Sequence, residues 1–187
     1  MIYKSWRLAA ALLLILLFSR GIHAGTNKVD SLAVGSKAPG FTLPDLNNNY
    51  VFLRDFCGEK LRKPWKNKIK HAVVISFFAT WCVPCQKEIP HLMKVQDKFK
   101  DQPVKFFLID VGEKFEKVSP FVKKNGYTIP VLLDQYQVTK EKYGAHTLPR
   151  LVVLDKNGFV RLYKTGFDES APFEKDMTIL LEKLLRE

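Results

Sequence analysis

Hydrophobic and polar positions alternate along the chain in a pattern that predicts strands and helices in turn. The continuous apolar, β-branched and aromatic stretch from Ala72 to Ala79 is typical of a central strand covered on both faces. Apolar residues then recur at helical spacing, with lysines left for solvent, which predicts an amphipathic helix. These apolar residues are Cys85, Ile89, Leu92, Met93 and Phe99. Because Val104–Ile109 reads as a second buried strand, the three elements form a βαβ unit with a parallel, right-handed connection.

Turn residues divide the remaining segments into shorter elements. Glycine, proline and asparagine punctuate residues 34–50, which suits a hairpin of two short strands, Phe41–Leu43 and Tyr50–Leu53. The Asn157-Gly158 turn predicts a second antiparallel hairpin, because this pair readily adopts positive φ angles. Its strands are Leu151–Leu154 and Phe159–Tyr163. An apolar face over Ser170–Leu185 predicts a closing helix.

The N-terminus has the features of an export signal. Lys4 and Arg7 precede an uninterrupted apolar run from Leu8 to Phe18, and a small residue, Ala24, follows shortly after. This run of 11 residues is much shorter than the ~20 residues that span hydrocarbon, so a permanent anchor is the weaker interpretation. We therefore expect residues 1–24 to be a signal peptide cleaved after Ala24, and residues 25–187 to form a single exported domain.

Composition fits an ordinary globular protein. The chain has 187 residues, 47% of them hydrophobic and 26% charged, which excludes a disordered or collagen-like protein. Its formal net charge of +11 becomes +8 without residues 1–24, because that segment holds three basic and no acidic residues. The domain is therefore basic even after export.

Much of this charge lies in the basic segment 54–70. Its seven basic residues face only Asp55 and Glu59, a local charge of +5. Such a patch can steer an acidic protein partner or an anionic membrane surface, although a solvated loop is the ordinary interpretation. No nucleic-acid motif or interleaved aromatic pattern accompanies it, so nucleic acid is not an expected partner.

The candidate chemistry lies between the first central strand and its helix, at Cys82-Val83-Pro84-Cys85. Cys82 falls near the helix N-cap, where unpaired N–H groups and the helix dipole favour a thiolate, so it is the predicted nucleophile. Cys85 is one turn further on, close enough to form a disulfide with Cys82, and is the predicted resolving thiol. Pro84 suits the first helical turn.

Other uses of a CxxC pair fit less well. Zinc needs two more ligands, and the remaining Cys57, His71, His91 and His146 show no paired spacing, so no metal site or cofactor is expected. A purely structural disulfide would close so short a loop that it would constrain little of the unfolded chain. The pattern therefore favours thiol–disulfide exchange.

These residues resemble a known family. The Trp81–Cys85 motif after an apolar strand, the Gly35-x-x-Ala38-Pro39-x-Phe41-x-Leu43 opening and Thr147-Leu148-Pro149 before the final hairpin are similar to exported TlpA/ResA-type thiol–disulfide oxidoreductases. The resemblance covers about Val34 to Leu185. It implies an α/β thioredoxin fold with a mixed central sheet, flanking helices, an N-terminal β-hairpin and an inserted segment after the second central strand, within Gly112–Leu133.

The resemblance also implies roles for individual residues. A cis bond at Leu148-Pro149 would face the CxxC and expose the Leu148 backbone to a substrate peptide, whereas an ordinary trans proline is the alternative. Glu88 would be an acid on the buried side that exchanges a proton with Cys85, with a pKa raised by burial; a solvated Glu paired with lysine is the alternative. Ser76 stands where thioredoxins carry a buried Asp, so their proton relay is absent.

Other residues near the motif receive more ordinary interpretations. Trp81 is expected to pack beside the disulfide and shape the docking surface. Cys57 is expected to be a buried, idle thiol, with a regulatory disulfide as the minority interpretation. His146 is expected to be a bystander. Leu148 is bulkier than the Thr or Val often found before this proline, and Arg150 follows it. The choice of partner and the reduction potential can therefore differ from those of better-known family members.

The resemblance implies a reductant of protein disulfides in a bacterial periplasm or cell envelope. The family's frequent tasks are reduction of apocytochrome c or of metal-centre thiols, with electrons from a membrane thiol transporter. A peroxiredoxin-like peroxidase is one alternative, disfavoured because Cys82 lacks the spaced Pro and Thr that such enzymes place before their reactive cysteine. A copper(I) chaperone using Cys82, Cys85 and a nearby His is another.

Overall fold

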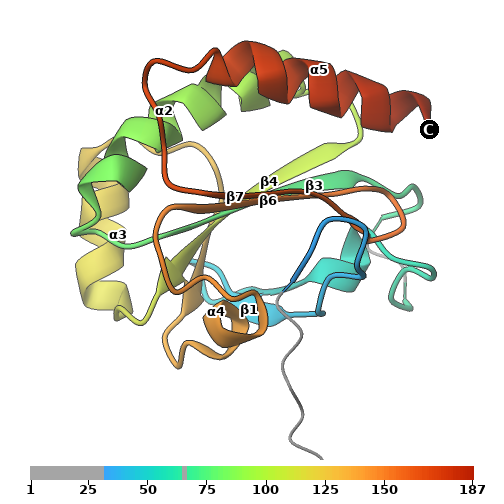
Figure 1. Cartoon of the computed structure of the whole chain (residues 1–187). Coiled ribbons are helices and arrows are strands. Elements are labelled where there is room, and N and C mark those ends of the chain that lie inside the picture. Colours follow the sequence, from blue (N-terminus) through green and yellow to red (C-terminus); the bar gives the residue numbers. More distant parts are fainter. Residues whose placement is uncertain (1–31, 65–66) are drawn as a thin grey trace, which may run out of the picture. The chain divides into compact units, whose positions relative to one another are not determined.

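The computed structural model describes residues 32–64 and 67–187 (Figure 1). The predicted signal peptide lies outside the described residues. The described residues belong to one compact unit. None of the helices in the described part of the chain is long and apolar enough to cross a membrane.

A five-stranded mixed sheet forms the centre of this unit, in the order β5-β4-β3-β6-β7. β3, β4 and β5 run parallel, whereas β6 is antiparallel to β3 and β7 is antiparallel to β6. The strands are β3 (Ala72–Phe78), β4 (Val104–Val111), β5 (Val131–Asp134), β6 (Arg150–Leu154) and β7 (Val160–Thr165). Every residue of β3 is buried, which explains its uninterrupted apolar sequence.

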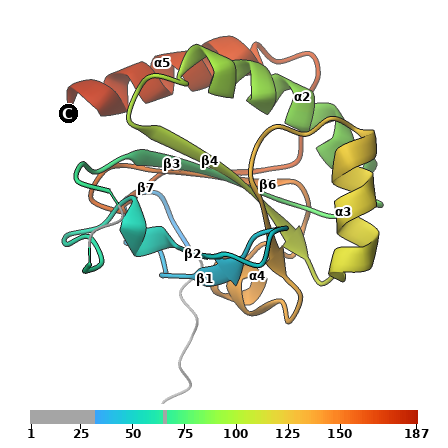
Figure 2. The ribbon, with the colours of Figure 1, turned by 180° about the vertical axis from the view of Figure 1, so that it is seen from behind.

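Two layers cover this sheet, as the two opposite views show (Figures 1 and 2). The long helices α2 (Val83–Lys98) and α5 (Phe173–Arg186) pack on one face, with a core that includes Leu92, Phe99 and Leu181. On the other face lie the N-terminal hairpin and the short helix α4 (Val138–Lys142). The thioredoxin fold expected from the sequence is therefore confirmed.

The N-terminal β-hairpin is also confirmed, with small shifts of its bounds. β1 (Thr42–Pro44) pairs antiparallel with β2 (Tyr50–Phe52), and the 3₁₀ turn η1 (Leu53–Asp55) follows. The Asp45 carboxylate accepts hydrogen bonds from the Asn47 and Asn49 N–H groups, both of 2.8 Å, which stabilises the connecting turn.

The inserted segment after the second central strand forms elements of its own. Helix α3 (Phe115–Lys124) and strand β5 add a second parallel βαβ unit at the edge of the sheet. Helix α4 did not emerge from the sequence, because only 5 residues are too few for a clear apolar period.

The register of the sheet fixes where the candidate motif lies. Ala72 is opposite Val104 and Phe78 is opposite Asp110, so β3 and β4 have their carboxyl ends at the same edge. Cys82 follows β3 by a few residues, at that edge. Ligand and active sites of open α/β sheets are commonly found at this position.

Candidate active site

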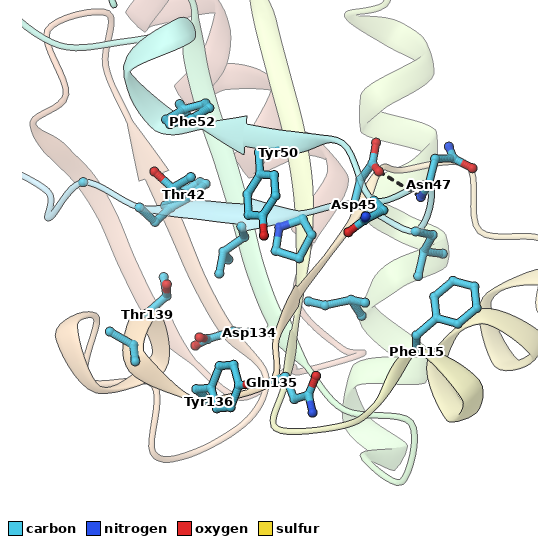
Figure 3. Close-up of a pocket in the computed structure, with 18 of the residues that line it drawn as sticks. Thr42, Asp45, Asn47, Tyr50, Phe52, Phe115, Asp134, Gln135, Tyr136 and Thr139 are labelled. Atoms are coloured by element: carbon cyan, nitrogen blue, oxygen red, sulfur yellow. Dashed lines mark hydrogen bonds between the residues drawn. The ribbon is translucent and has the colours of Figure 1, made fainter.

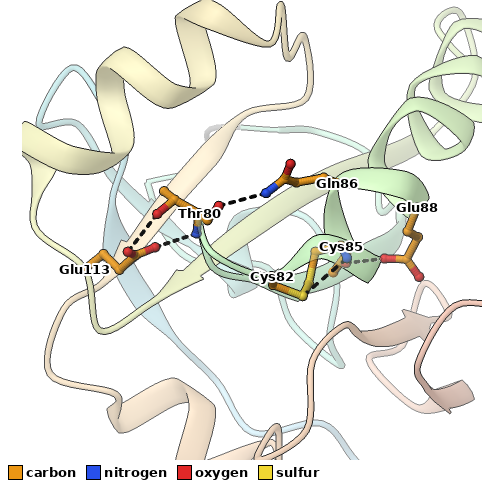
Figure 4. The surroundings of a disulfide bond; sticks show 7 residues. Thr80, Cys82, Cys85, Gln86, Glu88 and Glu113 are labelled. Carbon is orange, nitrogen blue, oxygen red and sulfur yellow. Dashed lines mark hydrogen bonds between the residues drawn. A yellow bond between two sulfur atoms is a disulfide. The ribbon is translucent and has the colours of Figure 1, made fainter.

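Cys82 and Cys85 are joined by a disulfide at the start of α2 (Figure 4). Cys82 is the N-cap residue of the helix, and its sulfur accepts a hydrogen bond of 3.3 Å from the Cys85 N–H. Pro84 lies in the first turn, where a missing N–H leaves no helical bond unmade. The predicted strand, N-cap and helix arrangement of the motif is confirmed.

The two sulfurs differ in their access to solvent. Cys82 is 4% exposed and lines a groove of about 810 Å³, whereas Cys85 is 0% exposed and faces the core. Even Cys82 presents little surface, so a partner must approach it along the groove. The more accessible Cys82 therefore suits the role of attacking thiol, and the shielded Cys85 suits the role of resolving thiol.

The groove is bounded on its far side by the loop before β6. The Leu148-Pro149 bond is cis, Leu148 lines the groove and Pro149 is buried. Trp81 also lines the groove, but it is 67% exposed, so it packs less closely on the protein than expected from the sequence. His146 lies in the same groove and forms an ion pair of 3.8 Å with Glu141.

Glu88 lies one helical turn after Cys85 and is completely buried. Its Oε2 accepts a hydrogen bond of 2.7 Å from the Ser76 hydroxyl on β3, while its Oε1 has no hydrogen-bond partner among the described residues. Burial raises the pKa of Glu88 to about 7, partly opposed by the Ser76 hydrogen bond and by the positive charge of Lys164. The alternative of a solvated Glu paired with a lysine is wrong, because the helix turns this side chain into the core.

A pair of carboxyl groups, which sequence reasoning missed, lies on the other side of the motif. Glu113 accepts hydrogen bonds from the N–H and the hydroxyl of Thr80 (Figure 4), and it also forms an ion pair with Lys117. Asp110, at the end of β4, accepts from the Glu113 N–H. Adjacent parallel strands end at one edge, so the acidic residues after β4 were a usable signal for this cluster.

The two carboxyl groups titrate in opposite directions. Burial, together with the neighbouring Glu113, raises the pKa of Asp110. Burial also acts on Glu113, but hydrogen bonds from Lys117 and Thr80 outweigh it and lower the pKa of Glu113. These opposite shifts favour a proton on Asp110 and a charged Glu113, which ties the end of β4 to the turn that leads into Cys82.

A second, larger groove of about 1210 Å³ lies beside the N-terminal hairpin (Figure 3). Tyr50, Phe115 and Tyr136 line it together with polar residues such as Asp45 and Asn47. Neither cysteine of the disulfide and no residue of the Leu148-Pro149 bond is among its lining residues. Despite its size, this groove is separate from the redox chemistry.

The third cysteine lies outside the active site. Cys57 is a buried free thiol, and burial, followed by the charge of Asp155, raises its pKa to about 12. An idle buried thiol agrees with this environment. Among residues 32–64 and 67–187, no group of three or more His, Cys, Asp or Glu side chains is placed to hold a metal ion.

This fold and site define a class. A CxxC disulfide at the N-terminus of a helix that follows a central strand, opposite a cis-proline loop, makes the protein a thioredoxin-like thiol–disulfide oxidoreductase. Comparison with known proteins narrows the class. A profile of the AhpC/TSA family matches residues 34–163, and the chain belongs to that family, within which it resembles the ResA proteins.

Individual relatives support this assignment. Thiol-disulfide oxidoreductase ResA of Geobacillus kaustophilus is 33% identical over 159 residues, covering 83% of this chain and 84% of that protein. ResA of Bacillus subtilis is 32% identical, covering 73% and 70% of the two chains. The crystal structure of a candidate thiol:disulfide interchange protein DsbE from Chlorobium tepidum is 26% identical, with a TM-score of 0.70, and covers 83% of this chain and 99% of that one.

Proposed function

We propose that the protein is an exported reductant of protein disulfides in the bacterial envelope. The observation that carries the proposal is the Cys82–Cys85 disulfide, with Cys82 in a groove facing Leu148-Pro149 and Cys85 shielded behind it. The substrate class is a polypeptide disulfide, because an open groove with exposed Trp81 at its rim suits an extended chain better than a small molecule.

Exchange begins from the reduced pair. The Cys82 thiolate, favoured by the N-terminus of α2, attacks one sulfur of the substrate disulfide and expels the other as a thiolate. Cys85 then attacks Cys82 in the mixed disulfide, which releases the second substrate thiolate and forms the Cys82–Cys85 disulfide. Two electrons pass to the substrate, whose two thiolates take up protons.

Glu88 supplies a place for the Cys85 proton. Cys85 is buried and must lose its proton before it can attack. Glu88 is buried one turn further along α2, and its Oε1 has no hydrogen-bond partner among the described residues. Because the pKa of Glu88 is about 7, its ionised form is well populated at neutral pH and can accept that proton. Ser76 holds the other carboxyl oxygen and so orients the group.

The groove supports specific roles for neighbouring residues in substrate binding. Leu148 presents its backbone beside Cys82, where an extended substrate segment can pair with it. Trp81 and Pro84 complete the surface around the disulfide, and the buried Pro149 is proposed to hold Leu148 in position for the substrate. The substrates that we propose are apocytochrome c or thiols of a metal centre, and a membrane thiol transporter is the proposed electron donor.

Trapping the mixed disulfide tests this function. In Cys85→Ser, Cys82 can attack a substrate disulfide, but no second thiol can resolve the mixed disulfide. Envelope extracts treated with the reduced variant should therefore yield covalent adducts that dithiothreitol removes. Cys82→Ser should yield none, and the matched control Cys57→Ser should behave as wild type. Adducts that form equally well with Cys82→Ser would contradict the assignment of the nucleophile.

Export is proposed on the N-terminal sequence. A positively charged start, an apolar run of 11 residues and Ala24 support cleavage after Ala24. The mass of the protein recovered from the envelope fraction tests this: loss of residues 1–24 is the expected result, and a full-length chain in the membrane fraction would show a retained anchor.

A further inference from the structure

One end of the compact unit is far more basic than the rest. Three segments meet there, at the amino ends of β3 and β4: residues 56–64 with 67–71, the turn 100–103 and the β6–β7 turn 155–159. The Gly58 N–H donates to the Lys156 carbonyl at 3.1 Å, and Lys70 Nζ donates to Asn157 Oδ1 at 3.0 Å. The Ala72 N–H donates to the Pro103 carbonyl at 3.0 Å, which joins the third segment.

This end lies opposite the disulfide. β3 starts here at Ala72 and leads toward Cys82, and its 7 residues at ~3.3 Å each separate the two ends by about 23 Å. In Figure 1 the turn into α2 is on the left, and residues 56–64 and 67–71 and the β6–β7 turn are on the right.

We call this surface the cationic end. It gathers nine basic side chains against four acidic ones, a net charge of +5. The basic residues are Lys37, Lys60, Arg62, Lys63, Lys68, Lys70, Lys100, Lys105 and Lys156, and the acidic ones are Asp55, Glu59, Asp101 and Asp155. Two of the acids are buried and form ion pairs, Asp55 with Arg62 and Asp155 with Arg161.

Exposed positive charge and an exposed apolar side chain occur together on this end. Ile69 is 60% exposed and lies between Lys68 and Lys70. None of Lys60, Lys68 and Lys105 has an ion-pair partner among the residues that the structure describes. The sequence alone showed only the basic segment 54–70, and folding adds Lys37, Lys100, Lys105 and Lys156 from distant parts of the chain.

We propose that the cationic end is a docking surface for the anionic phospholipid face of a membrane. Lysines around an apolar side chain match such an interface, where each basic group near the surface strengthens binding about fivefold and the apolar group enters the headgroup region. An acidic protein would seat side chains in hollows, but the groove at Cys82 has no lining residue from this end. The groove beside the hairpin reaches this end only at Arg62, whose charge is paired with Asp55.

The start of the described chain fits this orientation. Gly35 and Ser36 form hydrogen bonds with Val160, next to the β6–β7 turn, so the described part of the chain begins close to the cationic end. A domain docked in this way points its Cys82 groove away from the lipid, into the aqueous space where polypeptide substrates lie. Docking itself does not depend on the proposed thiol chemistry.

Vesicle partitioning of the full chain tests the proposal. The measured quantity is the ratio of partition coefficients for phosphatidylglycerol-containing and pure phosphatidylcholine vesicles, in which any charge-independent binding cancels. The triple variant K60Q/K68Q/K105Q should lower this ratio about 100-fold, and about 0.5 M NaCl, which screens charges beyond about 4 Å, should lower it in the wild type. The matched control K123Q/K124Q/K142Q should retain the wild-type ratio. Equal losses in both variants, or a wild-type ratio near one, would overturn the proposal.

A local probe locates the contact. Because Cys57 is buried and Cys82 and Cys85 are oxidised, an environment-sensitive fluorophore can be attached selectively to Ile69→Cys. Its emission should shift to the blue with the anionic vesicles only, whereas a label at Tyr136→Cys, 85% exposed elsewhere on the domain, should not respond. A response of the Ile69 label to soluble polyglutamate but not to vesicles would assign the surface to an acidic protein instead and overturn the membrane proposal.

Discussion

The Ser76 hydroxyl donates a hydrogen bond of 2.7 Å to Glu88 Oε2, joining β3 to α2 inside the core. The two positions had separate meanings in the sequence: Ser76 marked a missing acid on the strand, and Glu88 marked an extra acid on the helix. In the fold they meet. Glu88 on the helix therefore lies beside the strand position where a thioredoxin carries its buried Asp. Ser76, which stands at that position, holds the Glu88 carboxylate in place.

Replacing Glu88 with Gln should slow resolution by Cys85 without affecting the first attack. Cys85 then has no buried base, so single-turnover reduction of a disulfide peptide should fall about 100-fold. Formation of the mixed disulfide by Cys82 should keep its wild-type rate. In the wild type the resolution rate should fall as the pH drops through about 7, and this step should be absent in the variant. Glu116→Gln, on the exposed face of α3, is the matched control, and an unchanged resolution rate in Glu88→Gln would remove Glu88 from the mechanism.

Ser76→Ala should move that pH dependence upward. The Ser76 hydrogen bond stabilises the ionised carboxylate and so lowers the pKa of Glu88, and its loss should raise that pKa further above its present value of about 7. The midpoint of the resolution rate against pH reports this shift, and Ser76→Thr, which keeps a hydroxyl, should restore it. A midpoint that stays in place would show that the hydrogen bond does not tune Glu88.

Glu88 should also make the oxidised protein less stable as the pH rises. Its pKa is raised from 4.5 to about 7 on folding, so between these values the native state holds a proton that the unfolded state releases. The free energy of unfolding should therefore decrease by about 3 kcal/mol across this window. Glu88→Gln should lack this contribution, and denaturant titrations of both proteins at several pH values give the difference. A constant difference between the two curves would contradict the raised pKa.

Glu113→Gln should destabilise the domain. Glu113 accepts from both donors of Thr80 and from Lys117, and a glutamine offers only one acceptor oxygen. At least one buried donor then loses its partner, which lowers the free energy of unfolding by about 1–3 kcal/mol. Lys117→Gln removes only the exposed side of the cluster and should cost less than about 1 kcal/mol. Equal costs would mean that the Thr80 contacts contribute little.

The sequence predicted the fold and the redox pair because their signals are local. An apolar strand, a helix N-cap cysteine and a turn with Asn-Gly each depend on a few neighbouring residues, and the cis Leu148-Pro149 bond followed from the family resemblance. Contacts between distant segments were not accessible in this way. The Thr80–Glu113 and Ser76–Glu88 hydrogen bonds need the strand register and the rotation of α2. The gathering of Lys105 and Lys156 beside the basic segment likewise needs the sheet topology.

The reduction potential of the Cys82/Cys85 pair tests the central claim most directly. Equilibration of the protein against thiol redox buffers, followed by mass-shift alkylation, gives the potential, with Cys57 serving as an internal unreactive thiol. A reductant of protein disulfides should show a value near or below about −200 mV. A value near about −120 mV would make the protein an oxidant that installs disulfides and would contradict the proposed direction of electron flow.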